Sequence, residues 1–171
     1  MNAIPSVGLT LEPQTAAHAE AMFVVLSDPA LYEFESEPPP SIPWLAERFR
    51  QLETRRSGDG QQHWLNWVLR EAGGELIGFV QATVRRDGRA QIAYMLGSTW
   101  WGKGYASRAV AAMLAELHRE YAVTHPEAVF KQDNHRSRRL LERLNFLRVD
   151  AGAPGHLDLE PDENIMARRL S

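Results

Sequence analysis

The chain has 171 residues, of which 19 are basic and 22 acidic, so its formal net charge at pH 7 is −3. This balance gives no sequence-wide attraction to nucleic acid, and the absence of cysteine excludes disulfides, thiolate nucleophiles and cysteine-ligated zinc. No apolar run approaches the roughly 20 residues that cross a bilayer, and the first residues do not resemble a targeting signal. We therefore expect one cytoplasmic domain over residues 1–171, with no nucleic-acid or membrane partner.

The first thirty residues predict a short strand followed by a helix. Residues from Leu9 to Leu11 alternate in polarity and stop before Pro13, as an edge strand does. Thr15 is placed to cap a helix that ends near Asp28, because the residue before a proline avoids helical geometry. The expected inward positions of this helix are Ala19, Met22, Phe23 and Leu26.

An acidic, proline-rich loop then separates this helix from a second one. After one further turn over residues 30–34, residues 33–40 combine three acids with three prolines and predict an extended loop. Ser41 is placed to cap the second helix, which ends around residues 58–60. The expected inward side of this helix carries Trp44, Leu45, Phe49 and Leu52.

Residues 63–96 have the alternating pattern of three strands. Gly73-Gly74 separates residues 63–70 from residues 76–84, and Asp87-Gly88 joins the second strand to a third over residues 89–96. Short connections of this kind join antiparallel neighbours. The pattern therefore predicts an antiparallel meander.

The third strand of the meander leads into a glycine turn and a long helix. After Trp101-Gly102-Lys103-Gly104 the apolar period changes to 3.6 residues, and the apolar stripe continues to Tyr121. Glycines let the backbone approach a ligand closely, and a helix N-terminus carries unpaired N–H groups with a partial positive charge. The turn is therefore predicted to bind an anion.

The rest of the chain predicts a buried strand, a helix and two final strands. Residues 128–130 form an apolar run after a helical crossover, which favours parallel pairing with the strand before the turn. Asn134 or Ser137 can cap the next helix, whose inward positions are leucines, and Asn145 suits a left-handed residue after its end. The last strands are expected at residues 147–150 and 164–170, with a loop at residues 151–155 between them.

Two nucleotide-binding motifs are excluded at the glycine turn. A mononucleotide P-loop needs a hydroxyl residue after its Gly-Lys pair to hold Mg²⁺, and here Gly104 follows Lys103. A Rossmann fingerprint needs a third glycine within a parallel βαβ unit. In this chain Ser107 occupies that position and the turn follows an antiparallel meander.

Two segments resemble motifs of the GCN5-related N-acetyltransferases (GNAT). Residues 101–106, WGKGYA, resemble the family's acetyl-CoA pyrophosphate motif Q/R-x-x-G-x-G/A, with Trp101 in place of the first Gln or Arg. Residues 134–146, NHRSRRLLERLNF, resemble its N-x-x-S…LEKLGF segment, with Asn145 in place of the usual glycine. The order and separation of the two segments also match, and the chain is similar to the RimJ- and RimL-like branch of the family.

The resemblance implies an α/β fold with a mixed, mostly antiparallel sheet of about six to seven strands and about four helices. In this fold two parallel strands splay apart at the acetyl-CoA site, and no metal is needed. The cofactor-binding residues that the resemblance implies are Tyr94, Met95, Leu96, Trp101, Gly102, Lys103, Gly104, Tyr105, Ala106, Ser107, Asn134 and Ser137. A basic patch on the second segment is either a solvated helix face or a contact for the CoA 3′-phosphate; it consists of Arg136, Arg138, Arg139 and Arg143.

Direct acetyl transfer needs a proton for the departing thiolate and a deprotonated amine. Ser137 is the one motif-placed candidate for the general acid, because the tyrosine that many relatives carry four residues later is replaced by Leu141. Relatives often place an acid on the strand that leads into the turn, where this chain has Gln91. Glutamine cannot act as a base and could only position a water, so the candidates for a general base lie elsewhere in the chain, at Glu33, Glu35, Glu37 and His63.

The resemblance places the acceptor site at the first two helices and their connecting loop. The carboxylates and aromatic rings of this region suit a cationic amine; the candidates are Glu33, Glu35, Trp44 and the nearby Trp64. We therefore predict transfer of acetyl from acetyl-CoA to a primary amine, a protein N-terminus or a small molecule, within a ternary complex. The alternative is a CoA-binding sensor or interaction domain without catalysis, and a homodimer is compatible with either function.

Overall fold

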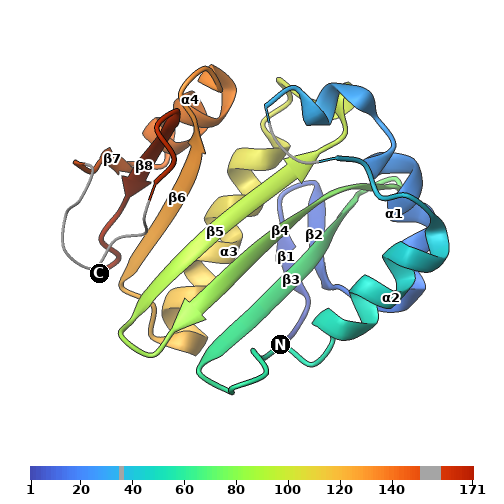
Figure 1. The fold of residues 1–171 in the computed structure, drawn as a ribbon, viewed down its shortest axis with the longest axis horizontal. Helices are drawn as coiled ribbons and strands as arrows, with labels where there is room; N and C mark the ends of the chain where they lie inside the picture. Colours follow the sequence, from blue (N-terminus) through green and yellow to red (C-terminus); the bar gives the residue numbers. More distant parts are fainter. Residues whose placement is uncertain (35–36, 151–158) are drawn as a thin grey trace.

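The computed structural model describes residues 1–34, 37–150 and 159–171. These residues contain one mixed sheet of eight strands in the order β1-β2-β3-β4-β5-β6-β8-β7 (Figure 1). Neighbouring strands are antiparallel except β5 and β6, which are parallel as predicted. The strands are β1 (Ile4–Ser6), β2 (Leu9–Pro13), β3 (Gln62–Glu71), β4 (Leu76–Arg85), β5 (Arg89–Leu96), β6 (His125–Lys131), β7 (Leu147–Arg148) and β8 (Glu163–Ala167).

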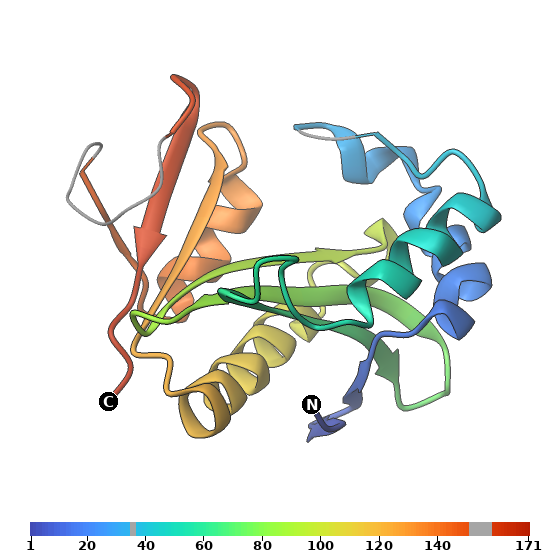
Figure 2. The ribbon, with the colours of Figure 1, turned by 60° about the horizontal axis from the view of Figure 1, so that its bottom comes forward.

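Helices cover both faces of the sheet. Helices α1 (Ala19–Leu26) and α2 (Ile42–Leu52) lie on one face at one end of the sheet, whereas α3 (Tyr105–Tyr121) crosses the other face (Figure 2). Helix α4 (His135–Arg143) follows β6. Three single turns complete the described helical segments: η1 (Ala16–His18), η2 (Pro29–Tyr32) and η3 (Ser98–Trp100).

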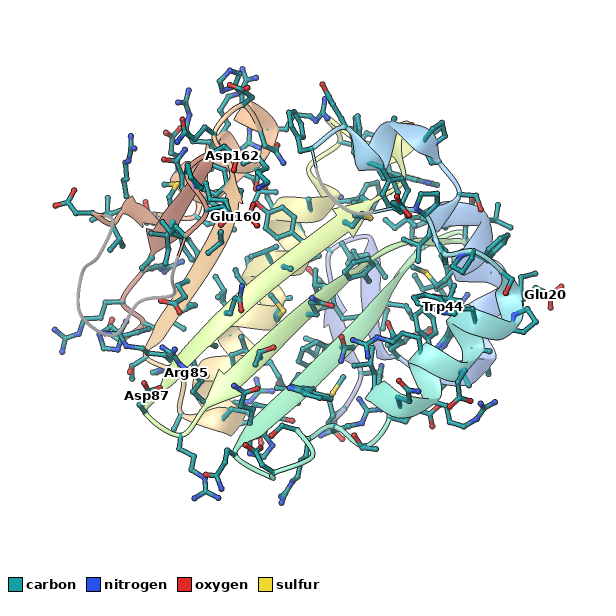
Figure 3. The ribbon with its side chains drawn as sticks, in the orientation of Figure 1. Glu20, Trp44, Arg85, Asp87, Glu160 and Asp162 are labelled. Carbon is teal, nitrogen blue, oxygen red and sulfur yellow. The ribbon has the colours of Figure 1, made fainter. Side chains whose placement is uncertain are left out.

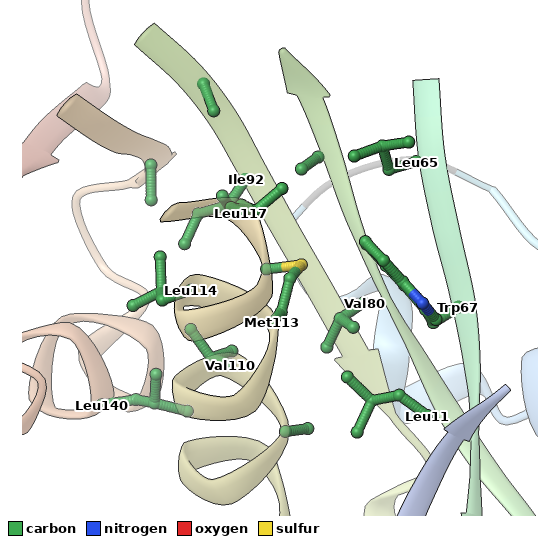
Figure 4. Close-up of a cluster of buried hydrophobic side chains, with 14 of the residues drawn as sticks. Leu11, Leu65, Trp67, Val80, Ile92, Val110, Met113, Leu114, Leu117 and Leu140 are labelled. Carbon is green, nitrogen blue, oxygen red and sulfur yellow. The ribbon is translucent and has the colours of Figure 1, made fainter. Parts of the chain in front are cut away.

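The main core lies between α3 and the sheet (Figure 4). The 3.6-residue period puts the apolar side chains of α3 on one stripe, and the alternation of the strands supplies the opposing layer. The facing residues, all nearly inaccessible to solvent, are Val110, Met113, Leu114 and Leu117 from α3 and Leu11, Leu65, Trp67, Val80 and Ile92 from the strands. Each such side chain contributes about 1.5–3 kcal/mol on burial, so this packing fixes the start of α3 relative to β5.

A second, smaller core lies under α1 and α2. Met22 and Leu26 of α1 and Leu45 and Phe49 of α2 are buried there, as predicted. The prediction that Trp44 also faces inward is wrong, because its side chain is 51% exposed on the outer surface of α2 (Figure 3). In a helix that buries positions 45 and 49, position 44 is rotated by about 100° away from the core.

Most of the predicted elements are confirmed, with one strand more than expected. The meander, the cap at Ser41 and the left-handed Asn145 (φ 61°) are present. Strand β1 was not predicted; it contains Pro5, which only an edge strand tolerates, and it turns into β2 at Gly8 (φ 74°). The loop predicted at residues 151–155 lies outside the described residues. Within the described ranges, no helix has the length and apolar character needed to cross a membrane.

Candidate active site

The site is built where the two parallel strands separate. Strands β5 and β6 pair only at Arg89 with His125, Ala90 with Pro126 and Gln91 with Glu127, and they diverge beyond this point (Figure 1). The carboxylate of Glu127, which is 1% exposed, lies 3.6 Å from Arg85 and 3.7 Å from Arg89. These arginines belong to β4 and β5, so the ion pairs join three strands at the closed end of the opening; Figure 3 labels Arg85 at this end of the sheet.

The hydrogen-bond pattern of β5 directs alternate backbone groups into the opening. The Gly97 N–H donates to the Ile77 carbonyl (3.0 Å), and bonded pairs alternate along an antiparallel ladder. Met95 therefore directs its backbone groups toward β4, whereas Tyr94 and Leu96 direct theirs toward the opening. The Leu96 carbonyl accepts a hydrogen bond from the Trp101 indole N–H (2.8 Å). Of residues 94–96, Tyr94 thus has the backbone best placed to pair with an extended ligand.

The glycine turn has a backbone conformation that favours glycine. Gly102 (φ 74°) and Gly104 (φ 78°) both have left-handed geometry, and α3 begins directly after them at Tyr105. A Cβ atom at Gly102 would meet no atom within 4 Å, and one at Gly104 would meet only the Arg108 side chain, at 3.3 Å. The turn therefore leaves space around the N–H groups at the start of a 17-residue helix, where an anion is stabilised.

The sequence left open whether Asn134 or Ser137 caps α4, and in the structure Asn134 is the cap. The Asn134 side chain caps the helix, because its Oδ1 accepts the Ser137 N–H at 3.0 Å. The Ser137 hydroxyl is not used for capping and lies 2.7 Å from the Tyr94 hydroxyl. Burial raises the pKa of Tyr94 to about 12, and the hydrogen bond to Ser137 acts in the opposite direction. The phenol is therefore protonated at neutral pH.

A cavity of about 930 Å³ passes through the opening and connects the two faces of the sheet. At one end it is lined by the glycine turn, the start of α3 and the start of α4. At the other end it reaches the face that carries α1 and α2, where its walls are Leu31, Phe34, Phe79, Gln81, Ala93 and Val129. This volume is in the range of small-molecule and cofactor sites.

The wall residues at the second end were missed by the sequence predictions. Phe79 and Gln81 from β4, Ala93 from β5 and Val129 from β6 come together only when the sheet forms. Alternation places Phe79 and Gln81 on the same face of β4, but it gives no indication that this face borders the opening. Leu31 and Phe34 come from the loop region that the resemblance did indicate.

Several predicted acceptor and base residues lie away from the cavity. Trp44 lies on the outer surface of α2 (Figure 3), and the Trp64 indole donates to Gln62 on β3. His63 packs edge-on against Tyr121, at the far end of α3, with 5.7 Å between ring centroids. Of the remaining base candidates, Glu37 is exposed and does not line the cavity, and Glu35 lies outside the described residues. Gln91, at the position where relatives often carry an acid, is also exposed and does not line the cavity.

Arg136 connects the two ends of the cavity. Its guanidinium lies 4.0 Å from the centre of the Trp101 ring and donates to the Glu33 carboxylate at 2.8 Å. Glu33 is thus paired with a cation of the protein itself. The predicted basic patch divides, because Arg136, Arg139 and Arg143 line the cavity whereas Arg138 faces Glu142 at 3.8 Å.

The splayed strands, the glycine turn and the second motif match the predicted acyltransferase fold, and comparisons with known proteins identify the family. A family model described as "Acetyltransferase (GNAT) domain" matches residues 8–147. The chain therefore belongs to the GNAT acetyltransferases and is an acetyl-CoA-dependent acyltransferase. A relative described as uncharacterized N-acetyltransferase p20 of Bacillus licheniformis is 29% identical over 140 residues, which cover 81% of this chain and 78% of the relative.

Solved structures share the fold at lower sequence identity. RimL, described as the ribosomal L7/L12 alpha-N-protein acetyltransferase, in complex with coenzyme A, has a TM-score of 0.83 at 17% identity, covering 98% of both chains. The microcin C7 self-immunity acetyltransferase MccE, in complex with acetyl-CoA and AMP, has a TM-score of 0.79 at 17% identity, covering 95% of this chain and 93% of that one. These similarities confirm the predicted fold.

Proposed function

We propose that the protein transfers acetyl from acetyl-CoA directly to an uncharged primary α-amine, such as a protein N-terminus or an amino-acid-like small molecule. The observation that carries this proposal is the cavity that joins the glycine turn to the opposite face of the sheet. Such a passage lets donor and acceptor meet from opposite sides without a covalent enzyme intermediate. Bound acetyl-CoA supplies the activated thioester.

The donor end has groups suited to each part of acetyl-CoA. The N–H groups of the turn from Gly102 and of the first residues of α3, through Ser107, would bind the pyrophosphate. The backbone of Tyr94 would pair with the pantetheine arm as an added strand. Asn134, which caps α4, would lie beside that arm. Ser137 would donate its hydroxyl proton to the departing sulfur. Arg139 and Arg143, which line the cavity, would interact with phosphate groups.

The acceptor end favours an amine that is uncharged at neutral pH. Its walls are mainly apolar, and Glu33, the nearby carboxylate, is paired with Arg136. Together these features disfavour an ammonium ion. An α-amine with a pKa near 7.7–8.0 is about one-quarter to two-fifths neutral at pH 7.5, whereas a lysine amine with a pKa near 10.4 is about 0.1% neutral. The alpha-N-protein activity named for RimL supports an α-amine as acceptor. The AMP in the MccE complex is a small molecule, so we include small-molecule acceptors in the proposal.

An amine panel tests the proposal. Acetyl-CoA is mixed with a short peptide bearing a free N-terminus, the same peptide with a blocked N-terminus and one lysine, a free amino acid amide, spermidine and an aminoglycoside. Thiol release gives the rate, and mass spectrometry locates the acetyl group. We expect turnover of the free N-terminus or the amino acid amide. Turnover of only the lysine peptide or the polycations would overturn the α-amine assignment. CoA binding without turnover of any amine would instead support the sensor alternative.

A further inference from the structure

Two hydroxyl groups from opposite sides of the opening meet inside the cavity. Tyr94 belongs to β5 and Ser137 to α4, 43 positions apart in the chain, and their side-chain oxygens are 2.7 Å apart. Both residues line the cavity at the level where the strands have separated. The contact was not predicted, because the resemblance named Tyr94 only as a cofactor-binding residue.

This contact compensates for a residue that the second motif lacks. The position four residues after Ser137 is Leu141, whose side chain is fully buried in the main core and carries no proton to donate. The Tyr94 phenol reaches Ser137 from the strand instead of from the helix. The Ser137 backbone N–H donates to the Asn134 side chain, so the cap does not involve the Ser137 hydroxyl. This hydroxyl can therefore rotate between Tyr94 and the cavity.

We propose that Tyr94 is a positioning residue that acts through Ser137, donating its phenolic hydrogen to the Ser137 oxygen and thereby directing the serine proton at the leaving sulfur. The inference rests on the proposed acetyl transfer. In this arrangement Ser137 accepts from one side and donates to the other. Because burial holds the pKa of Tyr94 well above neutrality, the phenol remains a donor throughout the physiological range.

The proton balance closes without any further reactant. The C–S bond breaks with its electron pair on sulfur, and sulfur takes the Ser137 hydroxyl proton. The serine oxygen takes the phenolic proton of Tyr94. The amine nitrogen, which has formed the new C–N bond, loses one proton to water, and water returns a proton to Tyr94. The net change is the movement of one proton from nitrogen to sulfur.

Three variants test whether the two hydroxyls act as one unit. Ser137→Ala removes the donor but retains the backbone N–H that Asn134 caps, so kcat should fall about 100-fold with the KM for acetyl-CoA changed less than threefold. Tyr94→Phe keeps the ring and should lower kcat about tenfold. The double variant should match Ser137→Ala alone, because the tyrosine acts only through the serine. Tyr121→Phe, at the distal end of α3, is the matched control and should leave kcat unchanged.

A second measurement does not depend on turnover. Free CoA is titrated into each variant by calorimetry between pH 6 and 10, which gives the pKa of the bound thiol. If the hydroxyl pair stabilises the thiolate, both Tyr94→Phe and Ser137→Ala should raise this pKa relative to the wild type. A merely structural role for Tyr94 would weaken CoA binding equally at every pH. That result would overturn the inference. A decrease in kcat of the double variant equal to the product of the decreases in the two single variants would overturn it as well.

This inference and the proposed function can fail separately. If the wild-type protein acetylates no amine, the proposed function fails. If the wild-type protein acetylates an amine but Tyr94→Phe has wild-type kcat and wild-type thiol pKa, only the role of Tyr94 fails.

Discussion

The two ends of the cavity are built in different ways. The donor end consists largely of backbone features: left-handed glycines, the N-terminus of α3, the alternating hydrogen bonds of β5 and the cap of α4. The acceptor end consists of side chains from η2, β4, β5 and β6. Backbone features follow from short motifs, whereas the acceptor wall depends on which side chains the sheet brings together. The difference explains why a sequence identifies a donor more readily than an acceptor.

Side-chain contacts attach the loop at the acceptor end to the rest of the site. Asp28, just before η2, accepts hydrogen bonds from the N–H groups of Ser98 (2.8 Å) and Ala30 (3.0 Å), and the bonds from Ser98 lower the pKa of its carboxyl group. On the other side of the cavity, Arg136 binds Glu33 while lying against Trp101. The loop is thus attached to the donor end at two points. Variants at the donor end should change CoA binding or helix stability, whereas a variant at the connection to the acceptor end should change acceptor binding.

Among the variants that compare how the two ends are built, the largest effect is expected at the glycine turn. Gly104→Val puts a β-branched residue at φ 78° and adds atoms beside the N–H groups of α3, so we expect the Kd for CoA to rise at least about tenfold. Calorimetry measures this Kd. Gly60→Val is the matched control, because Gly60 has φ 69°, open space around its Cβ position and no place in the cavity wall. It should lose similar stability but bind CoA normally. Equal CoA affinity in the two variants would contradict the assignment of the turn.

An intermediate effect is expected at the cap of α4. Asn134→Ala removes the acceptor for the Ser137 N–H and should lower the free energy of unfolding by about 1 kcal/mol, measured by chemical denaturation. Asn134→Asp keeps an acceptor oxygen at the helix N-terminus and should retain most of the stability. If the Asn134 amide also contacts CoA, both variants should bind CoA more weakly. If Asn134→Ala unfolded with the same denaturant midpoint as the wild type, the cap would contribute nothing to stability.

The smallest effect is expected at the connection between the two ends. Arg136→Gln removes the ion pair with Glu33, and an exposed pair contributes less than about 1 kcal/mol. We therefore expect the KM for the acceptor amine to change about threefold, with the KM for acetyl-CoA unaffected. Arg138→Gln is the matched control on the same helix, since Arg138 is about as exposed and pairs with Glu142. Identical steady-state constants for the two variants would remove Arg136 from the acceptor site.

Much of the donor end could be predicted from the sequence because its features are local. The turn at Gly102 and Gly104, the cap at Asn134 and the parallel partner of β5 all follow from residue type, spacing and the handedness of crossover connections. The acceptor predictions were less successful for a physical reason. Trp44 lies on an outward helical position, and the carboxylate of Glu33 is paired with an arginine more than 100 positions away.

The sequence by itself determined the sheet order around the glycine turn and an anion site at that turn, and the resemblance of its two motifs to the GNAT family indicated the class of protein and the donor. The sheet order and the anion site depend on backbone conformations that glycine and alternating apolar residues impose locally. Only the tertiary structure decided that Tyr94 meets Ser137, that Arg136 pairs with Glu33 and that Phe79 and Val129 border the opening. Contacts of this kind depend on how far β5 and β6 separate, which no local pattern specifies.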